Sequence, residues 1–354
     1  LSSSPMFRVE ATRGDQVESL HRVSLAVVDG DGRRVAGAGD PDLVTFWRSA
    51  AKPFQALPLL AEGAAASFGF DDRHLALACA SHSSEPRHRA LAGEMLERAG
   101  VREADLACGP HPPISPEIAA EAARTGAALT PLWSNCSGKH AGMLALAKFR
   151  GWPLVGYQLA GHPLQRRIQV EVARWSGVSE DRQLLGVDGC TVVSFALPLR
   201  AMALAYARFA TASEPAARQL RQAMSDHPGL IAGTDRVETD LGEAASGLVI
   251  AKVGADGIYC VALPWAGLGL ALKVEDGGME AAAVALLEAL RQLAQRVGLG
   301  FEPAELPPAV TRHARPERLD TRGGVTGLLR PAGALRFGDV GGVVPPATSG
   351  TGRP

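Results

Sequence analysis

A serine and a lysine stand three residues apart near the start of the chain, at Ser49 and Lys52. Residues with this spacing share one face of a helical turn, so the lysine amine can reach the serine hydroxyl. A neutral lysine can accept the hydroxyl proton, and the amino end of a helix helps to stabilise the negative charge. The motif indicates a nucleophilic serine, although an ordinary serine with a solvated lysine has the same pattern.

Two further segments carry side chains that could join this pair. Lys252 ends a predicted strand and is followed by Val253 and Gly254. This resembles the lysine–threonine–glycine strand motif of penicillin-recognising serine enzymes, with valine in the middle position. Ser81 follows the apolar run from Leu75 to Cys79 and is placed to line a cleft. The alternative for Ser81 is a polar turn rich in helix-capping residues.

The segment from Ser134 to His140 gathers a thiol, an amine, an imidazole and hydroxyls just before an apolar helix. A second thiol, Cys190, stands close to the carboxylate of Asp188. Spacing alone does not distinguish a metal site from helix capping, since tetrahedral zinc sites usually show Cys or His pairs. The polar loop with Asp235 and Glu238 could face a substrate or serve only as a connector.

The composition favours a globular protein and argues against a nucleic-acid-binding or membrane-spanning one. The chain has 354 residues, of which 46% are hydrophobic, so it can bury a core. Its net charge of −1 gives no basic excess for nucleic acid, and no apolar run is long enough to span a membrane. Five scattered cysteines and no export signal lead us to expect a cytoplasmic protein with reduced thiols. Only five of the 36 basic residues are lysine, which draws attention to each lysine.

Hydrophobic periodicity gives the elements that must position these residues. We expect a β-hairpin over 22–38, helices over 114–127, 163–176, 193–211, 215–226 and 279–297, and a three-stranded meander over 247–253, 257–263 and 267–275. Strands therefore come at the two ends, with helices between them. This order predicts an α+β fold, with sheet parts at about 7–48 and 241–300 and a helical part at about 49–240. The Pro- and Gly-rich residues 338–354 are predicted to be a disordered tail.

Seven segments in this order resemble the asparaginase II family, the class 3 L-asparaginases of the Rhizobium etli type. They are RSAAKPFQALPLL, ASHSSEP, NCSGKHAGML, GHPLQRRI, GVDGCTVVSFALPL, HPGLIAGTDRVET and AKVGADGIYC. The resemblance covers about residues 7–337 and implies a single domain over that range. It implies an antiparallel sheet flanked by helices, related to the serine β-lactamases and penicillin-recognising proteins. It also implies a homodimer that hydrolyses L-asparagine to L-aspartate and ammonia.

The resemblance also implies roles for individual residues. Two serine–lysine pairs would carry the catalysis, Ser49 with Lys52 and Ser81 with a strand lysine that we assign to Lys252, with Lys273 as the competing candidate. One zinc ion would be held by Cys136, Lys139 and Cys190, with Asp188 as a polar neighbour. Zinc is expected to stiffen one wall of the pocket. The expected substrate-binding residues are Arg48, His140 and Asp188.

Three rival functions remain at this stage. A glutaminase would use the same chemistry, because one methylene group changes discrimination by only ~1–3 kcal/mol. Another serine amidase or esterase is the second rival. The third is a catalytically silent zinc-binding protein of the same fold, against which the two serine–lysine pairs argue.

Overall fold

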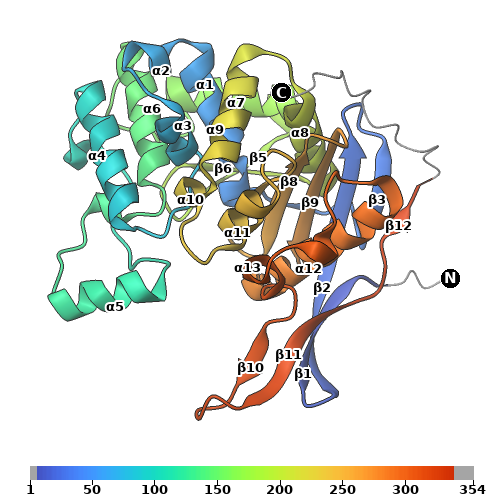
Figure 1. Cartoon of the computed structure of the whole chain (residues 1–354). Helices are drawn as coiled ribbons and strands as arrows, with labels where there is room; N and C mark the ends of the chain where they lie inside the picture. Colours follow the sequence, from blue (N-terminus) through green and yellow to red (C-terminus); the bar gives the residue numbers. More distant parts are fainter. Residues whose placement is uncertain (1–5, 339–354) are drawn as a thin grey trace, which may run out of the picture.

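Strands from both ends of the chain form one antiparallel sheet in the computed structural model, which describes residues 6–338. The nine strands are β1 (Arg8–Arg13), β2 (Gln16–Asp29), β3 (Arg34–Ala38), β7 (Ile250–Gly254), β8 (Ile258–Leu263), β9 (Leu268–Val274), β10 (Glu317–Leu319), β11 (Val325–Ala332) and β12 (Arg336–Phe337). Their main order is β10-β11-β1-β2-β9-β8-β7, and β3 pairs with both β2 and β12. In Figure 1 the long strand β2 continues downward with β1, β10 and β11.

Two helices cover the opposite faces of this sheet, α8 (Leu199–Thr211) and α12 (Met279–Val297). Successive strand residues point to opposite faces, and β8 shows this alternation. Its residues Ile258, Cys260 and Ala262 belong to the hydrophobic cluster that contains α8. Its residues Tyr259, Val261 and Leu263 belong to the cluster that contains α12. The meander β7-β8-β9 is therefore held from both sides.

The α8 face of the sheet carries small side chains because the helix lies very close to it. A Cβ atom added at Gly269 of β9 would lie 2.0 Å from the carbonyl oxygen of Ala203 in α8. Ala271 of β9 and Ala26 of β2 are fully buried in the same cluster. These small residues allow α8 to approach the sheet at backbone contact distance.

Most of the remaining helices form a body beside the sheet, at the upper left of Figure 1, while α5 (Pro116–Thr125) lies below that body and α13 (Pro308–Thr311) lies next to α12. The others are α1 (Lys52–Ala61), α2 (Ala64–Ser67), α3 (Asp72–Ala78), α4 (Pro86–Ala99), α6 (Ser137–Phe149), α7 (Pro163–Ser176), α9 (Pro215–Asp226), α10 (Pro228–Ile231) and α11 (Val237–Ala244). Five short 3₁₀ helices lie between them: η1 (Arg48–Ala51), η2 (Glu103–Asp105), η3 (Pro131–Trp133), η4 (Glu180–Arg182) and η5 (Pro303–Glu305). A second antiparallel sheet has the order β4 (Val44–Phe46), β6 (Val193–Pro198), β5 (Leu184–Val187).

The α+β class is confirmed, and so are the hairpin, the meander and the helices at 163–176, 215–226 and 279–297. The predicted helix at 193–211 is wrong in its first part, because residues Val193–Pro198 form strand β6. Pro198 lacks the N–H that a helix interior needs, and α8 begins after it. The expected sheet parts also omitted β10, β11 and β12.

The single-domain division over 7–337 stays a prediction. Of the predicted tail, only Gly338 lies among the described residues. No described helix combines the length and the apolar character that crossing a membrane requires.

Candidate active site

The first lysine of the site is the first residue of α1. Lys52 is 1% exposed and follows η1, the short helix that contains Ser49. The buried side chain of Tyr206 in α8 donates a hydrogen bond of 2.7 Å to the carbonyl of Ala50. The ring of Trp47 packs on that of Phe54 with centroids 4.9 Å apart. These contacts fix the turn from which Ser49 and Lys52 project.

Ser81 lies just beyond the end of α3, and its hydroxyl meets the amine of Lys52. The Nζ atom of Lys52 donates to Oγ of Ser81 at 2.9 Å and also to the carbonyl of Ala80. The backbone N–H of Ser81 donates to the carbonyl of Ile231 at 2.8 Å, which anchors the segment. The lysine of the first motif thus contacts the serine of the second.

A second lysine amine reaches the same hydroxyl from the sheet. Lys252 is fully buried in the middle of β7, and its Nζ atom lies 2.9 Å from Oγ of Ser81. A Cβ added at Gly254 would lie 2.9 Å from the carbonyl of Trp47, so β7 runs directly against the segment before η1. Lys273 on β9 instead donates to the carbonyls of Val274 and Asp256. The geometry therefore pairs Lys252, rather than Lys273, with Ser81.

The surroundings of Lys252 favour its neutral form. Burial is the largest cause, and the charge of Lys52 adds to it, so that together they lower the pKa of Lys252 to about 7. The carboxylate of Glu238 opposes this shift, and the guanidinium of Arg236 supports it. An amine with this pKa can accept and return a proton near neutral pH.

Ser49 and Ser81 open into one pocket of about 550 Å³. Ser49 is half-buried, and Ser81 is buried. Other lining residues come from several distant segments of the chain and include Asn135, Arg236, Val253, Asp256, Tyr259 and His313. The pocket is large enough for a small amino acid and presents it to both serines.

Arg48, which precedes Ser49, is paired with two carboxylates. Its Nε atom donates to Asp188 at 2.9 Å, and its Nη1 atom contacts Asp256. Its backbone φ of 53° is in the left-handed region, which is costly for an arginine. Although burial favours the neutral acid, Lys139 and Arg48 hold the pKa of Asp188 below its ordinary value. Arg48 and Asp188 are thus brought together, and each already has a partner.

The three residues expected to bind zinc also lie together. The Nζ atom of Lys139 is 2.9 Å from the sulfur of Cys190. A hydrogen bond from Cys190 lowers the pKa of Cys136, and Lys52 and Lys139 lower it further. Although burial opposes its charged form, the two sulfurs raise the pKa of Lys139.

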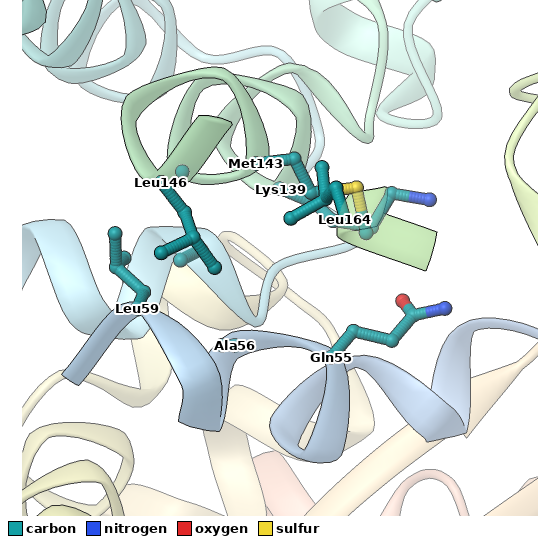
Figure 2. Close-up of a pocket in the computed structure, with 9 residues that line it drawn as sticks. Gln55, Ala56, Leu59, Lys139, Met143, Leu146 and Leu164 are labelled. Atoms are coloured by element: carbon teal, nitrogen blue, oxygen red, sulfur yellow. The ribbon is translucent and has the colours of Figure 1, made fainter. Parts of the chain in front are cut away.

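Packing between helices holds the expected zinc-binding residues in place. Figure 2 shows Gln55, Ala56 and Leu59 of α1 facing Lys139, Met143 and Leu146 of α6, with Leu164 of α7 beside them. In residues 6–338 no three His, Cys, Asp or Glu side chains cluster as a metal site. A site here would therefore depend on the lysine amine as its third donor.

His140, expected to bind substrate, is fully buried beside Tyr157. Its Nδ1 atom pairs with the Tyr157 hydroxyl. Burial is the main cause that lowers the pKa of His140 to about 4. A hydrogen bond with Cys190 opposes this shift and the charge of Lys139 supports it, so the imidazole is neutral near pH 7. A neutral ring offers no charge to a substrate carboxylate.

The sequence did not predict that Arg236, Glu238 and Tyr259 lie together at the pocket. Arg236 immediately precedes α11, and Tyr259 projects from β8 toward the same place. The Tyr259 hydroxyl donates to Oε2 of the buried Glu238 at 3.4 Å, and Nη2 of Arg236 lies 3.6 Å from Oε1 of that carboxylate. The only signal in the sequence was the polar loop that contains Asp235.

Comparison with known proteins gives one family. A family model described as L-asparaginase II matches residues 9–331. Comparison with curated protein sequences found no match. Among solved structures, one is described as Mglu in its native form in the presence of 4.3 M NaCl. It is 17% identical to this chain, with a TM-score of 0.36, and the match covers 80% of this chain and 62% of that chain. The chain thus spans less than two thirds of that protein. Simvastatin synthase (LovD) from Aspergillus terreus, as the LovD6 mutant, is 13% identical, with a TM-score of 0.32, over 71% of this chain and 86% of that chain.

Replacing Lys252 by methionine should stabilise the fold. The folded-state pKa of Lys252 is lowered from 10.5 to about 7, so the unfolded chain binds more protons between these pH values. Stability of the native protein therefore rises with pH across this window. Lys252→Met removes that dependence and should raise the free energy of unfolding at pH 7 by roughly 1–4 kcal/mol. Urea unfolding from pH 7 to 10 measures both effects. The exposed Lys148→Met is the control, and a less stable Lys252→Met would contradict the prediction.

Proposed function

Because the chain belongs to the L-asparaginase II family, we propose that it hydrolyses the side-chain amide of L-asparagine to L-aspartate and ammonia. The observation that carries this proposal is the pair of buried lysine amines, each 2.9 Å from the Ser81 hydroxyl. This hydroxyl opens into the same pocket as Ser49. Amide hydrolysis needs a nucleophile, a base and donors for the developing oxyanion, and this site can supply all three.

In the proposed mechanism a proton passes from Lys52 through Ser81 to Lys252. Lys52 donates to Ser81, while neutral Lys252 accepts the Ser81 proton, so both contacts of the Ser81 hydroxyl are used. Lys52 becomes neutral by this transfer and can then remove the proton of Ser49. Ser49 is the serine left free to attack, and it is the more exposed of the two.

The first chemical step forms a bond between Oγ of Ser49 and the side-chain carbonyl carbon of asparagine. The tetrahedral intermediate then loses its amine as ammonia, with a proton returned from Lys52 or through Ser81. Water attacks the resulting ester, passes its proton to the same relay and releases aspartate and the free Ser49 hydroxyl. The N–H of Ser49 lies at the start of η1, where no intrahelical partner uses it, and is our candidate oxyanion donor.

We also propose a zinc site formed by Cys136, Lys139 and Cys190. Two sulfurs and an amine match the preference of zinc for thiolate and nitrogen ligands, provided that the Lys139 ammonium releases its proton to solvent when the metal binds. Bound zinc would supply a positive charge that keeps both sulfurs deprotonated and fixed beside the pocket. Cys136 precedes α6, and Lys139 lies in its first turn, so the same ligands would hold this helix against Cys190.

The homodimer and the cytoplasmic location remain proposals as well. Support for the dimer comes from apolar side chains exposed on β4 and β5, with Val44, Leu184 and Val187 exposed by 50%, 61% and 80%. Support for the location comes from the five cysteines, all of which are free thiols.

Ammonia release from L-asparagine tests the function directly. Ser49→Ala should lower kcat by at least about a thousandfold, because it removes the attacking atom. Ser81→Ala should lower kcat by about a hundredfold or more, because it interrupts the relay. Ser67→Ala, at an exposed serine, is the control. Parallel assays with L-glutamine measure the amide preference. A folded wild-type protein that releases no ammonia from either amide would overturn the proposal.

The rate should depend on pH through Lys252. The relay starts only when this amine is neutral, so kcat/KM should rise with pH and level off above about pH 7. Below that value it should fall about tenfold per pH unit. Lys252→Arg, which cannot lose its charge, should abolish activity, whereas Lys148→Met should leave the profile unchanged. A rate independent of pH between 5 and 8 would rule out this role.

Metal analysis tests the zinc site without an activity assay. The purified protein should contain about one zinc per chain, and Cys136→Ser and Cys190→Ser should each lower zinc affinity at least about tenfold. Cys260→Ala, at a core cysteine on β8, is the control. Protein purified without chelator and still free of zinc would contradict the proposal.

A further inference from the structure

An arginine that lines the pocket has one guanidinium nitrogen without a hydrogen-bond partner among the described residues. Nη1 of Arg236 is buried and makes no hydrogen bond to any atom of residues 6–338. Arg236 lines the same pocket as Ser49 and Ser81. A buried donor without a partner is costly, and a charged one especially so. Such a group in a substrate-sized pocket indicates that a ligand supplies the missing acceptor.

Two other side chains near the pocket that could attract an anion are already engaged. Arg48 is paired with Asp188 and Asp256. His313 contacts Asp240 at 2.7 Å. Within the described chain, Arg236 is therefore the arginine of the pocket lining with a guanidinium nitrogen left for an anion.

Arg236 is held from behind by a buried carboxylate. The side chain of Glu238 is 1% exposed, and its Oε1 atom lies 3.6 Å from Nη2 of Arg236. This distance is too long for a hydrogen bond, and Oε1 is itself without a hydrogen-bond partner in residues 6–338. The Tyr259 hydroxyl donates to the other oxygen of Glu238. Glu238 is thus placed to orient the guanidinium through Nη2, while Nη1 stays without a partner in the described chain.

We infer that Arg236 binds the α-carboxylate of the amino-acid substrate and that Glu238 positions it. A guanidinium offers parallel N–H groups that match the two oxygens of a carboxylate. With the α-carboxylate on Arg236, the side-chain amide is left to face the two serines. The inference rests on the proposed function, since it concerns how that substrate is recognised.

The test compares substrates that differ by one charged group. 3-Aminopropanamide is asparagine without its α-carboxylate, and succinamic acid is asparagine without its α-amino group. For the wild-type protein, loss of the carboxylate should lower kcat/KM about a hundredfold or more. Arg236→Gln should lower kcat/KM for asparagine by a similar factor, mostly through KM. On 3-aminopropanamide, assayed above about pH 8 so that Lys252 is neutral with or without the Arg236 charge, the variant and the wild type should differ by less than about threefold.

Controls separate recognition from folding. Arg102→Gln removes an arginine that is exposed and paired with Asp105, and should change nothing. Arg236→Lys keeps the charge without the paired N–H groups and should fall between the wild type and Arg236→Gln. Glu238→Gln should raise KM about five- to tenfold while kcat stays within about twofold, which a merely structural role would not produce. Circular dichroism and melting temperature verify that each variant is folded.

The inference fails if Arg236→Gln lowers kcat/KM equally for asparagine and 3-aminopropanamide, or leaves both unchanged. If the wild type releases no ammonia, the proposed function is overturned, and calorimetric binding of L-asparagine decides this inference instead. Binding that weakens about a hundredfold in Arg236→Gln then supports it. Equal binding to both proteins, or no binding to the wild type, overturns it.

Discussion

Two cationic amines repel each other, and burial strengthens that repulsion, so Lys52 and Lys252 can share the Ser81 hydroxyl only while one of them is neutral. The fold is arranged to maintain this contact. Lys52 comes from the first turn of a helix, and Lys252 comes from the centre of a strand. That strand belongs to a meander packed on one face by α8 and on the other by α12. A less rigid support would let the amines separate and become hydrated, and the lowered pKa would be lost.

Other ionisable groups surround the two amines of Lys52 and Lys252, and acidic groups lie next to basic ones. The sulfurs of Cys136 and Cys190 lie on one side of the two amines, where Nζ of Lys139 contacts Cys190. Glu238 lies on another side, next to Arg236. The pKa of Cys190 is raised, and Arg236 lies near the carboxylate of Glu238, so within residues 6–338 no strong excess of negative charge faces the two amines. Burial and the charge of Lys52 can therefore bring the pKa of Lys252 close to neutrality, with Glu238 opposing them only in part. The arrangement also separates the part of the pocket that reacts from the part that can recognise a charged substrate.

The sequence alone could predict elements with a strong period and clear ends. The helix at 163–176 has Pro163 at its first position and Gly177 after its last residue, and both bounds were predicted correctly. The run around Val193 has no such signal, because a short apolar segment before a proline fits a strand or a helix equally well. The contact between Lys252 and Ser81 joins residues 171 positions apart, and only the resemblance to a family could suggest it. Arg236 could not be singled out, because its unpartnered nitrogen is a property of the packed loop.

Arg48, next to the proposed nucleophile Ser49, forms two ion pairs that dissolved salt weakens to different extents. Its two carboxylates differ in exposure, with 14% of the Asp188 side chain exposed and 67% of that of Asp256. Dissolved salt screens the exposed contact far more than the buried one. In concentrated salt the contact of Arg48 with Asp256, in the turn between β7 and β8, therefore weakens first, while the contact with Asp188 at the end of β5 persists. The turn itself stays held by the Lys273 amine on the Asp256 carbonyl, so salt changes the pairing of Arg48 without removing its buried partner.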